Sequence, residues 1–193
     1  QRQMCIRDSI SNLHNEIPPR ICSWREKFKL LEKSGIDFAF FLKFNNSLRT
    51  MSPENFISEI LDSINLKSFT VGDDFRFGLD RKGDTDQLRE WGKKRGILVE
   101  NTETILYKDE RVSSSRIRKA LIDNNFKLAE KLLGRPYTFS GKVVHGQHLG
   151  RTIDIPTANI WLPKQKLPIQ GVYAVQCNLG EKTYYGICLL YTS

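Results

Sequence analysis

The sequence has few cysteines, few prolines and no long hydrophobic run. Its four cysteines show no CxxC spacing, and no histidine stands near them in a metal-ligand pattern. A zinc site or a disulfide framework is therefore not expected, and a reducing, cytoplasmic setting is the default. No apolar run approaches the roughly 20 residues that cross a bilayer, so no membrane partner is expected either.

The chain is basic, with a formal net charge of +8 at pH 7. This charge favours anionic partners, among which nucleotides, phosphorylated cofactors and nucleic acids all qualify. The Lys and Arg residues are spread along the chain and form no long basic block. A dedicated nucleic-acid module is therefore not the leading prediction. Self-association stays open.

The two ends carry little structural signal. Residues 1–9 show no period, cap or strand pattern, and residues 189–193 follow directly on a strand-like run. We expect both stretches to be fraying ends or tails foreign to the domain.

Up to about residue 133, helix and strand signals alternate. Ser23 with Glu26 forms a capping box, and Ser52-Pro53-Glu54 is typical of a second helix start. Helices are predicted from Ser23 to near Gly35, from Ser52 to Ile64, over 85–95, and as a pair over 114–133; strands are predicted over 36–44, 67–72 and 97–106. Because strands and helices alternate, the expected architecture is an α/β fold with parallel strands. The aromatic-rich stretch 36–44 is expected to be one of its buried strands.

After Gly134-Arg135-Pro136 the pattern changes. Strand-like runs over 137–144, 171–178 and 182–188 are separated by loops that contain Gly and Pro. Such a pattern indicates a β-barrel or β-sandwich, so a domain boundary is expected near 134–137.

A glycine-bounded loop follows the strand at 67–72. Gly72 and Gly78 bracket it and would let backbone amides approach a ligand. Asp73 and Asp74 could orient Mg²⁺ or a ribose hydroxyl, and Phe75 and Phe77 could wall an aromatic ring. The alternative is a tight turn with two buried phenylalanines.

Three serines open the helix at 114. Ser113, Ser114 and Ser115 place hydroxyls and free amides where the helix dipole favours an anion. Arg116 and Arg118 add guanidinium donors that suit a triphosphate. The alternative is an ordinary serine cap with exposed arginines.

A third candidate group lies in the β region. Gly146 and Gly150 allow backbone to approach phosphates, and Arg151 follows. Thr157 and Asn159, after Pro156, would point to one face of an extended segment, where two oxygen ligands suit Mg²⁺. The alternative is a polar turn after a proline.

The first part of the chain resembles the FMN adenylyltransferase domain of bacterial bifunctional riboflavin kinase/FAD synthetases. The resemblance rests on these segments: 71–78, 81–84, 111–121, 44–45, 51–54 and 129–137. It implies transfer of AMP from ATP to FMN, which yields FAD and pyrophosphate. It also implies that residues 113–118, with Ser114 and Arg118 as catalytic phosphate ligands, handle ATP, and that Asn45 and the 72–78 loop line the nucleotide and flavin site.

The second part resembles the riboflavin kinase domain of the same enzymes, through residues 141–146, 150–151, 156–160 and 171–174. This resemblance implies a barrel that phosphorylates riboflavin to FMN with Mg-ATP. Thr157 and Asn159 would hold the Mg²⁺, and Gly146 with the Gly150 region would cover the nucleotide.

The predicted fold is therefore a Rossmann-like nucleotidyltransferase domain at 10–135 without its first strand, followed at 136–193 by the first strands of an antiparallel barrel. The family's HxGH motif is absent upstream of Ser23, and its glutamate base would lie past residue 193. We therefore expect the chain to be inactive or to bind its substrates without turnover.

Two other functions stay open. One is a basic nucleic-acid-binding module in which residues 111–119 contact phosphates, with salt-sensitive affinity. The other is a nucleotidyltransferase with a different acceptor, such as a nicotinate or pantetheine enzyme, although the appended β region argues against it.

Overall fold

A computed structural model describes residues 18–146, 157–162 and 166–191 of the chain. Its described part forms two compact units: residues 40–112, and residues 18–39 together with 113–191. The units divide the chain after Val112, whereas the sequence predicts a family boundary near residue 135. Each unit is described by itself below.

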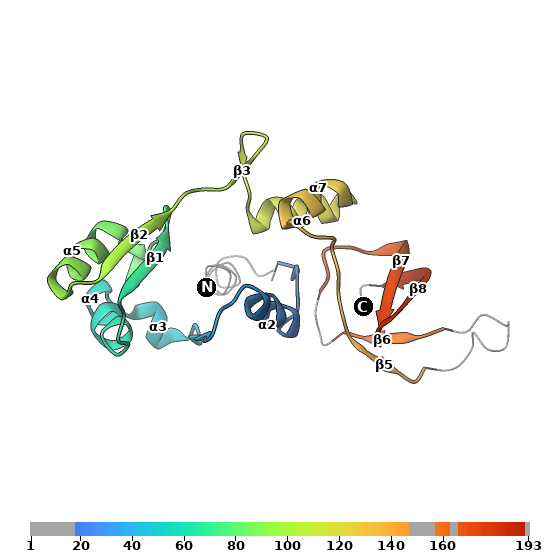
Figure 1. Ribbon diagram of the computed structural model, residues 1–193, viewed down its shortest axis with the longest axis horizontal. Helices are drawn as coiled ribbons and strands as arrows, with labels where there is room; N and C mark the ends of the chain where they lie inside the picture. The colour runs from blue at the N-terminus through green and yellow to red at the C-terminus, as the bar shows by residue number, and fades with distance from the viewer. Residues whose placement is uncertain (1–17, 147–156, 163–165, 192–193) are drawn as a thin grey trace. The chain divides into compact units, whose positions relative to one another are not determined.

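The first unit is a small parallel sheet covered by helices (Figure 1). Its elements are α3 (Asn46–Thr50), α4 (Pro53–Phe56), the π-helix η1 (Ile57–Leu61), β1 (Ser68–Gly72), the 3-10 helix η2 (Leu79–Arg81), α5 (Thr85–Arg95), β2 (Leu98–Thr102), β3 (Leu106–Tyr107) and β4 (Glu110–Arg111). Strands β1 and β2 pair in parallel, from Ser68 opposite Leu98 to Gly72 opposite Thr102, and α5 forms the crossover between them. The predicted α/β alternation is thereby confirmed for this pair.

The helix signals of this unit lie where the sequence places them. Ser52 caps α4 by accepting a hydrogen bond from the Asn55 amide, and Pro53 occupies the first turn. Asp84 caps α5 in the same way, and α5 ends at Gly96, whose φ of 67° favours glycine.

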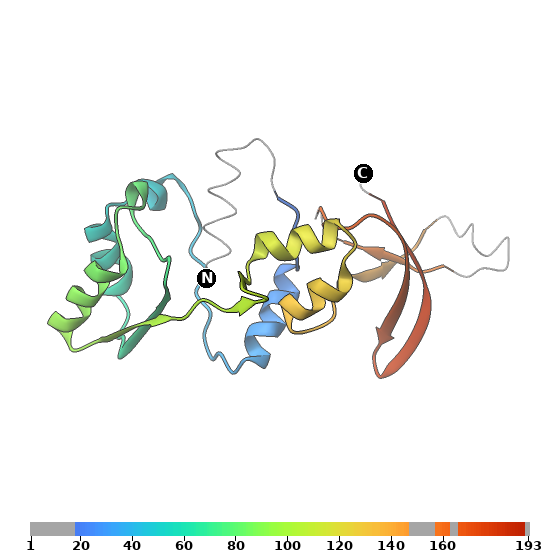
Figure 2. The same ribbon diagram turned by 90° about the horizontal axis from the view of Figure 1, so that it is seen from above.

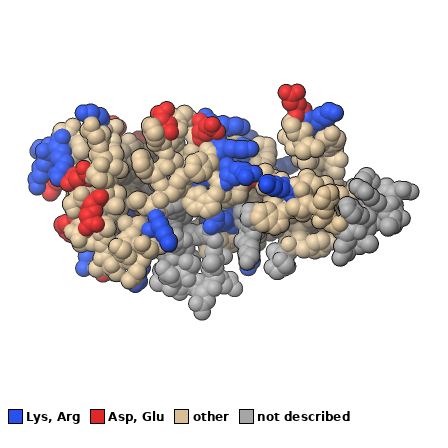
Figure 3. Space-filling model, turned by 90° about the horizontal axis from the view of Figure 1, so that it is seen from below, with Lys and Arg blue, Asp and Glu red and all other residues tan. Residues whose placement is uncertain are grey.

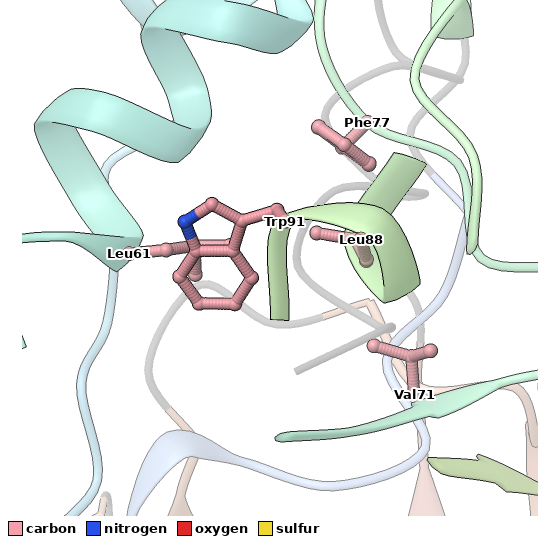
Figure 4. Packing of buried hydrophobic residues seen from close by; sticks show 5 residues of the cluster. All are labelled: Leu61, Val71, Phe77, Leu88 and Trp91. Atoms are coloured by element: carbon pink, nitrogen blue, oxygen red, sulfur yellow. The ribbon is translucent and has the colours of Figure 1, made fainter. Parts of the chain in front are cut away.

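The core of the first unit lies between the sheet and its helices. Leu61, Val71, Phe77, Leu88 and Trp91 form one buried cluster, shown in Figure 4. Leu88 is fully buried, since α5 turns its apolar side toward β1. The core therefore supports the end of β1 from which the glycine-bounded loop departs.

The prediction of a buried strand over 36–44 is wrong. The segment has no strand structure, and Phe38 and Phe40 are 80% and 65% exposed. A strand needs a ladder partner, and among the described residues β1 and β2 pair only with each other. The aromatic residues favoured a strand prediction, but no described strand lies beside this segment to pair with it.

In its described residues, the second unit combines helices with β-strands (Figure 2). Its elements are α2 (Trp24–Lys33), α6 (Ser114–Ile122), α7 (Phe126–Leu133), β5 (Lys142–Val144), β6 (Asn159–Trp161), β7 (Gly171–Leu179) and β8 (Lys182–Leu190). The capping box at α2 is confirmed, because Ser23 and Glu26 exchange both side-chain bonds. The predicted helical pair over 114–133 is likewise confirmed.

The strands of this unit form two antiparallel pairs. β5 pairs with β6, and β7 pairs with β8 over nine positions from Gly171 opposite Leu190 to Leu179 opposite Lys182. The predicted strand over 137–144 is shorter than expected, since only Lys142–Val144 has a described partner. The described residues after 136 contain no helix.

Candidate nucleotide-binding segments

The loop after β1 is held by charge pairing. The Arg111 Nη2 atom lies 2.8 Å from Asp74 Oδ2 and 3.6 Å from Asp73 Oδ1. The Thr104 hydroxyl also donates to Asp73. Both carboxylates are exposed and both face a guanidinium, so a ligand that used them would have to share or displace Arg111.

The two phenylalanines of this loop occupy different environments. Phe77 is 5% exposed and belongs to the core cluster, whereas Phe75 is only partly buried. Their rings stack at 5.8 Å with an interplanar angle of 23°. Phe77 therefore supports the loop from beneath, and of the two only Phe75 retains a partly exposed ring for contact with a ligand.

The far end of the loop is docked on the start of α4. Gly78 has a φ of 71°, and a Cβ added there would lie 2.7 Å from the Pro53 nitrogen. The Leu79 amide donates to the Met51 carbonyl at 2.6 Å. At the near end, the Phe75 amide donates to the Gly72 carbonyl at 3.0 Å. Backbone bonds thus close this loop at both ends.

Asn45, a predicted site residue, caps α3. Its Oδ1 accepts a hydrogen bond from the Leu48 amide at 2.9 Å, and the residue is exposed. The oxygen is thereby engaged locally, and the amide nitrogen is the atom that could still reach a ligand.

The serine-rich start of α6 forms a normal N-terminus. Ser113 has extended backbone angles and accepts a hydrogen bond from the Arg116 amide at 3.2 Å. Ser114 and Ser115 occupy the first turn, where amide groups have no partner within the helix. The first turn holds no acidic residue. This helix end therefore presents donors and positive potential without an opposing carboxylate of its own.

Arg118 lies one turn further along α6. Its Nε donates to the Pro19 carbonyl at 2.9 Å. Partial burial lowers the pKa of Arg118 from its ordinary value, although the side chain stays charged at neutral pH. Because the bond uses Nε, the two terminal nitrogens are the ones placed to act on an anion.

In the β region, Gly146 and Asn159 come into contact. β5 and β6 pair Val144 with Asn159, which brings the Asn159 side chain across the backbone of Gly146. A Cβ at position 146 would overlap the Asn159 Nδ2 atom. Thr157 is exposed two residues before Asn159. The glycine therefore forms a cradle that only a residue without a side chain can provide.

Three predicted site residues, Gly150, Arg151 and Pro156, lie outside the described residues. The described candidates fall into three groups: Asn45 and loop 72–78 in the first unit, and residues 113–118 and the Gly146/Thr157/Asn159 group in the second.

Two contacts of the loop aspartates were not predicted. Thr104 and Arg111 contact the loop aspartates. Thr104 lies inside the strand predicted over 97–106, whereas the observed β2 ends at Thr102 and leaves Thr104 at the same sheet edge as the loop after β1. Arg111 belongs to the segment 111–121 that carries the resemblance, but its pairing with the loop aspartates could not be predicted, because that approach depends on the β3–β4 turn.

Two features are absent from the described residues. These residues contain no group of three or more His, Cys, Asp or Glu side chains able to hold a metal ion. In the same residues no helix combines the length and apolarity that a bilayer crossing needs.

Two family models match the chain in series. The model described as FAD synthetase matches residues 8–116. The model described as riboflavin kinase matches residues 133–192. The order agrees with the resemblance drawn from the motifs.

Curated relatives carry both descriptions in one name. The bifunctional riboflavin kinase/FMN adenylyltransferase of Escherichia coli K12 is 42% identical over 175 residues, which are 90% of this chain and 56% of that protein. The Haemophilus influenzae protein of the same name is 40% identical over 163 residues, 84% of this chain and 53% of that protein. The chain thus spans about half the length of the curated relatives it matches.

A solved structure shows the same fold. The crystal structure of a macrolide-efflux protein from Streptococcus pneumoniae superposes with a TM-score of 0.77 at 30% identity, covering 91% of this chain and 57% of that one. The word efflux belongs to the name of that protein alone. Since the FAD synthetase model alone matches more than half of the 193 residues, the chain belongs to the FAD synthetase family.

Proposed function

We propose that this chain serves flavin cofactor biosynthesis as part of a bifunctional transferase. The FAD synthetase region would transfer AMP from ATP to FMN and release pyrophosphate. The riboflavin kinase region would transfer the terminal phosphate of ATP to riboflavin. The observation that carries this proposal is the match of both family models, in order, to the segments that hold the candidate residues.

The family division is proposed at 10–135 and 136–193. The first region would be a Rossmann-like adenylyltransferase domain, of which β1, α5 and β2 form a parallel pair with its crossover. The second would be the opening part of an antiparallel barrel, to which the β5–β6 and β7–β8 pairs contribute. Cytoplasmic location follows from this chemistry as part of the same proposal.

In adenylyl transfer, the start of α6 would bind ATP phosphates. Ser114 and Ser115 would donate from hydroxyls and amides, and Arg116 and Arg118 would supply charge. Catalysis of this kind depends on placing donors where negative charge develops, and α6 fixes its first turn through the Ser113 cap. Arg118 is fixed in addition by Pro19.

The flavin and nucleotide rings would lie near the loop after β1. Phe75 offers a partly exposed ring over the core, Asn45 offers an amide nitrogen, and the Gly72 and Gly78 ends admit backbone approach. Asp73 and Asp74 would bind a ribose hydroxyl or Mg²⁺ once Arg111 moves toward phosphate.

In riboflavin phosphorylation, Thr157 and Asn159 would hold Mg²⁺. Both offer neutral oxygen ligands, and the Gly146 cradle fixes the Asn159 side chain. This set fits Mg²⁺, which takes oxygen ligands and commonly completes its shell with phosphate oxygens and water. When bound, the ion would neutralise phosphate charge, while Gly146, Gly150, Arg151 and Pro156 would shape the cover over the nucleotide.

The proposal is tested by equilibrium titration of the full chain with a non-hydrolysable ATP analogue and Mg²⁺. Asn159→Ala should weaken analogue binding by about 10-fold or more, since it removes a metal ligand. Asn178→Ala is the matched control, because Asn178 is an exposed strand asparagine whose Oδ1 accepts only from Thr183 in the described bonds. Equal affinity of the two variants would overturn the role of Asn159.

A second pair of variants addresses α6. Ser114→Ala keeps the Ser113 cap and should weaken analogue binding in the presence of FMN by about 10-fold. Ser47→Ala changes an exposed serine in the first turn of α3 and should leave binding unchanged. If both variants bind as the wild type does, the start of α6 does not hold the nucleotide.

A further inference from the structure

Helix α6 is held by side-chain bonds within the second unit at its middle and just after its C-terminal end. At the middle of the helix, Arg118 Nε donates to the Pro19 carbonyl at 2.9 Å. Just after its end, the Tyr173 hydroxyl of β7 lies 2.8 Å from Asn124 Oδ1 and donates to it. These contacts join segments 99 and 49 residues apart in sequence, so neither arises from local helix geometry.

The two contacts belong to one ring of hydrogen bonds that joins α6, residues 19–20 and the segment before β7. The Arg20 amide, next to Pro19, donates to the Lys166 carbonyl at 3.0 Å. The Tyr173 hydroxyl also lies 2.8 Å from the Gln170 carbonyl, so the two oxygen acceptors share its single proton. The segment before β7 therefore connects to α6 at one end through residues 19–20 and at the other through Tyr173. Ile21 and Ile169, which are the sequence neighbours of Arg20 and Gln170, are both buried.

Tyr173 reaches the corner between α6 and α7 with its ring as well as its hydroxyl. The ring meets Phe126 of α7 edge-on, with centroids 5.5 Å apart and an angle of 84°. Asn124 stands at that corner with a φ of 55°, a conformation that asparagine tolerates well. A side chain of β7 thus touches both the corner residue and the first turn of α7.

We propose that α6 and α7 move as one rigid unit with the region that matches riboflavin kinase. The hydrogen bond of the Tyr173 hydroxyl holds the two helices to that region. Residues 113–118 were assigned from sequence to the adenylyltransferase domain. Through this ring of hydrogen bonds, residues 113–118 belong to the unit that contains β7. A ligand that orders β7 would accordingly order α6 without any change in the first unit.

The experiment is hydrogen exchange of the full chain, compared between Tyr173→Phe and Tyr184→Phe. Tyr173→Phe removes only the hydroxyl and keeps the ring on Phe126. Tyr184→Phe makes the same chemical change on the partner strand β8, at a residue 49% exposed. Tyr173→Phe should speed exchange in α6 and α7 by about fivefold, as expected for one hydrogen bond, while β8 stays within about twofold of wild type. Tyr184→Phe should change neither.

A third variant tests whether the two partners act together. Asn124→Gly removes the side chain at a backbone angle that glycine also accepts. If the Tyr173–Asn124 hydrogen bond joins β7 to α6, the two substitutions remove the same interaction. The double variant should then exchange its α6 amides no faster than the faster of the two single variants. The proposal is overturned if α6 and α7 exchange at the wild-type rate in Tyr173→Phe, or if β8 accelerates by the same factor, which would be general destabilisation.

Discussion

The core around α5 and the β7–β8 hairpin use similar apolar residues with opposite results. In the first, Leu88 and Trp91 are 0% and 6% exposed. In the second, Tyr185 and Ile187 are 83% and 76% exposed. The difference lies in what covers each surface, because α5 and the helices before β1 close over the sheet, whereas one face of the hairpin has no covering element among the described residues.

The hairpin pattern shows how this arises. Residues opposite each other share a face, so Val172, Leu189, Ala174 and Ile187 lie on one side. The other side holds Tyr173, which contacts the α6–α7 corner and is half-buried. Alternation therefore sets which residues share a side, and a packed partner decides which side is buried.

The largest effect is expected at the centre of the α5 core. Leu88→Ala should destabilise the first unit by about 2–5 kcal/mol, because it leaves a cavity in a fully buried cluster. Ile187→Ala, on the exposed hairpin face, should change stability by less than about 0.5 kcal/mol. Both changes in the free energy of unfolding are measured by urea denaturation, with hydrogen exchange of the α5 and β8 amides as the local readout. Equal losses would contradict the contrast between the two surfaces.

The next largest effect is expected at two glycines with similar backbone angles. Gly78 and Gly180 have φ values of 71° and 61°, but only Gly78 has a neighbour, Pro53, within 4 Å of an added Cβ. Gly180→Ala should cost about 1 kcal/mol for the left-handed conformation alone. Gly78→Ala should cost about 3 kcal/mol, since strain and overlap add. Thermal unfolding separates them, and similar costs would show that the loop is not tightly docked on α4.

A smaller effect concerns alkaline pH. Burial, reinforced by the charge of Glu26, raises the pKa of Tyr137 above its ordinary value of 10.0, and its buried hydroxyl has no hydrogen-bond partner among the described residues. The unfolded state therefore loses the Tyr137 proton first, so stability present below pH 10 is lost as pH rises further. At pH 11 the loss should be about 1 kcal/mol. Tyr137→Phe should flatten the fall between pH 9 and pH 11 by about this amount; an unchanged slope would contradict the buried hydroxyl.

The smallest effect is expected at two arginines of α5. Arg95 lies 2.7 Å from Asp62 and 5.6 Å from the Trp91 ring centroid. Arg89 pairs with Asp86 at 2.9 Å on an exposed helix face. Arg95→Ala should cost about 1 kcal/mol and Arg89→Ala about 0.3 kcal/mol, because exposed pairs contribute little. Chemical denaturation that ranks Arg89 above Arg95 would refute the role of the Trp91 contact.

Much of the local structure was predictable from sequence because its causes are local. The Ser23–Glu26 capping box, the Ser52-Pro53 helix start and the strand ending at Gly72 all depend on neighbouring residues. The wrong strand at 36–44 shows the limit, since strand formation depends on a partner that the segment itself does not specify.

The candidate sites show the same division. The start of α6 at the serines follows from the motif, whereas the contact between Gly146 and Asn159 was not predicted, because the pairing of β5 with β6 creates it. The pairing of Arg111 with the loop aspartates was not predicted either, because a turn between β3 and β4 places it. The burial of Phe77 was left open by sequence, since a loop aromatic can face a core or a ligand.

We propose that the chain binds adenine and flavin nucleotides, and titration of the full 193-residue chain with FMN and an ATP analogue in Mg²⁺ is the decisive test. Flavin fluorescence and calorimetry should both show saturable binding that falls when Mg²⁺ is removed. No binding of either ligand, together with salt-dependent binding of RNA or DNA, would overturn the proposal of nucleotide and flavin binding.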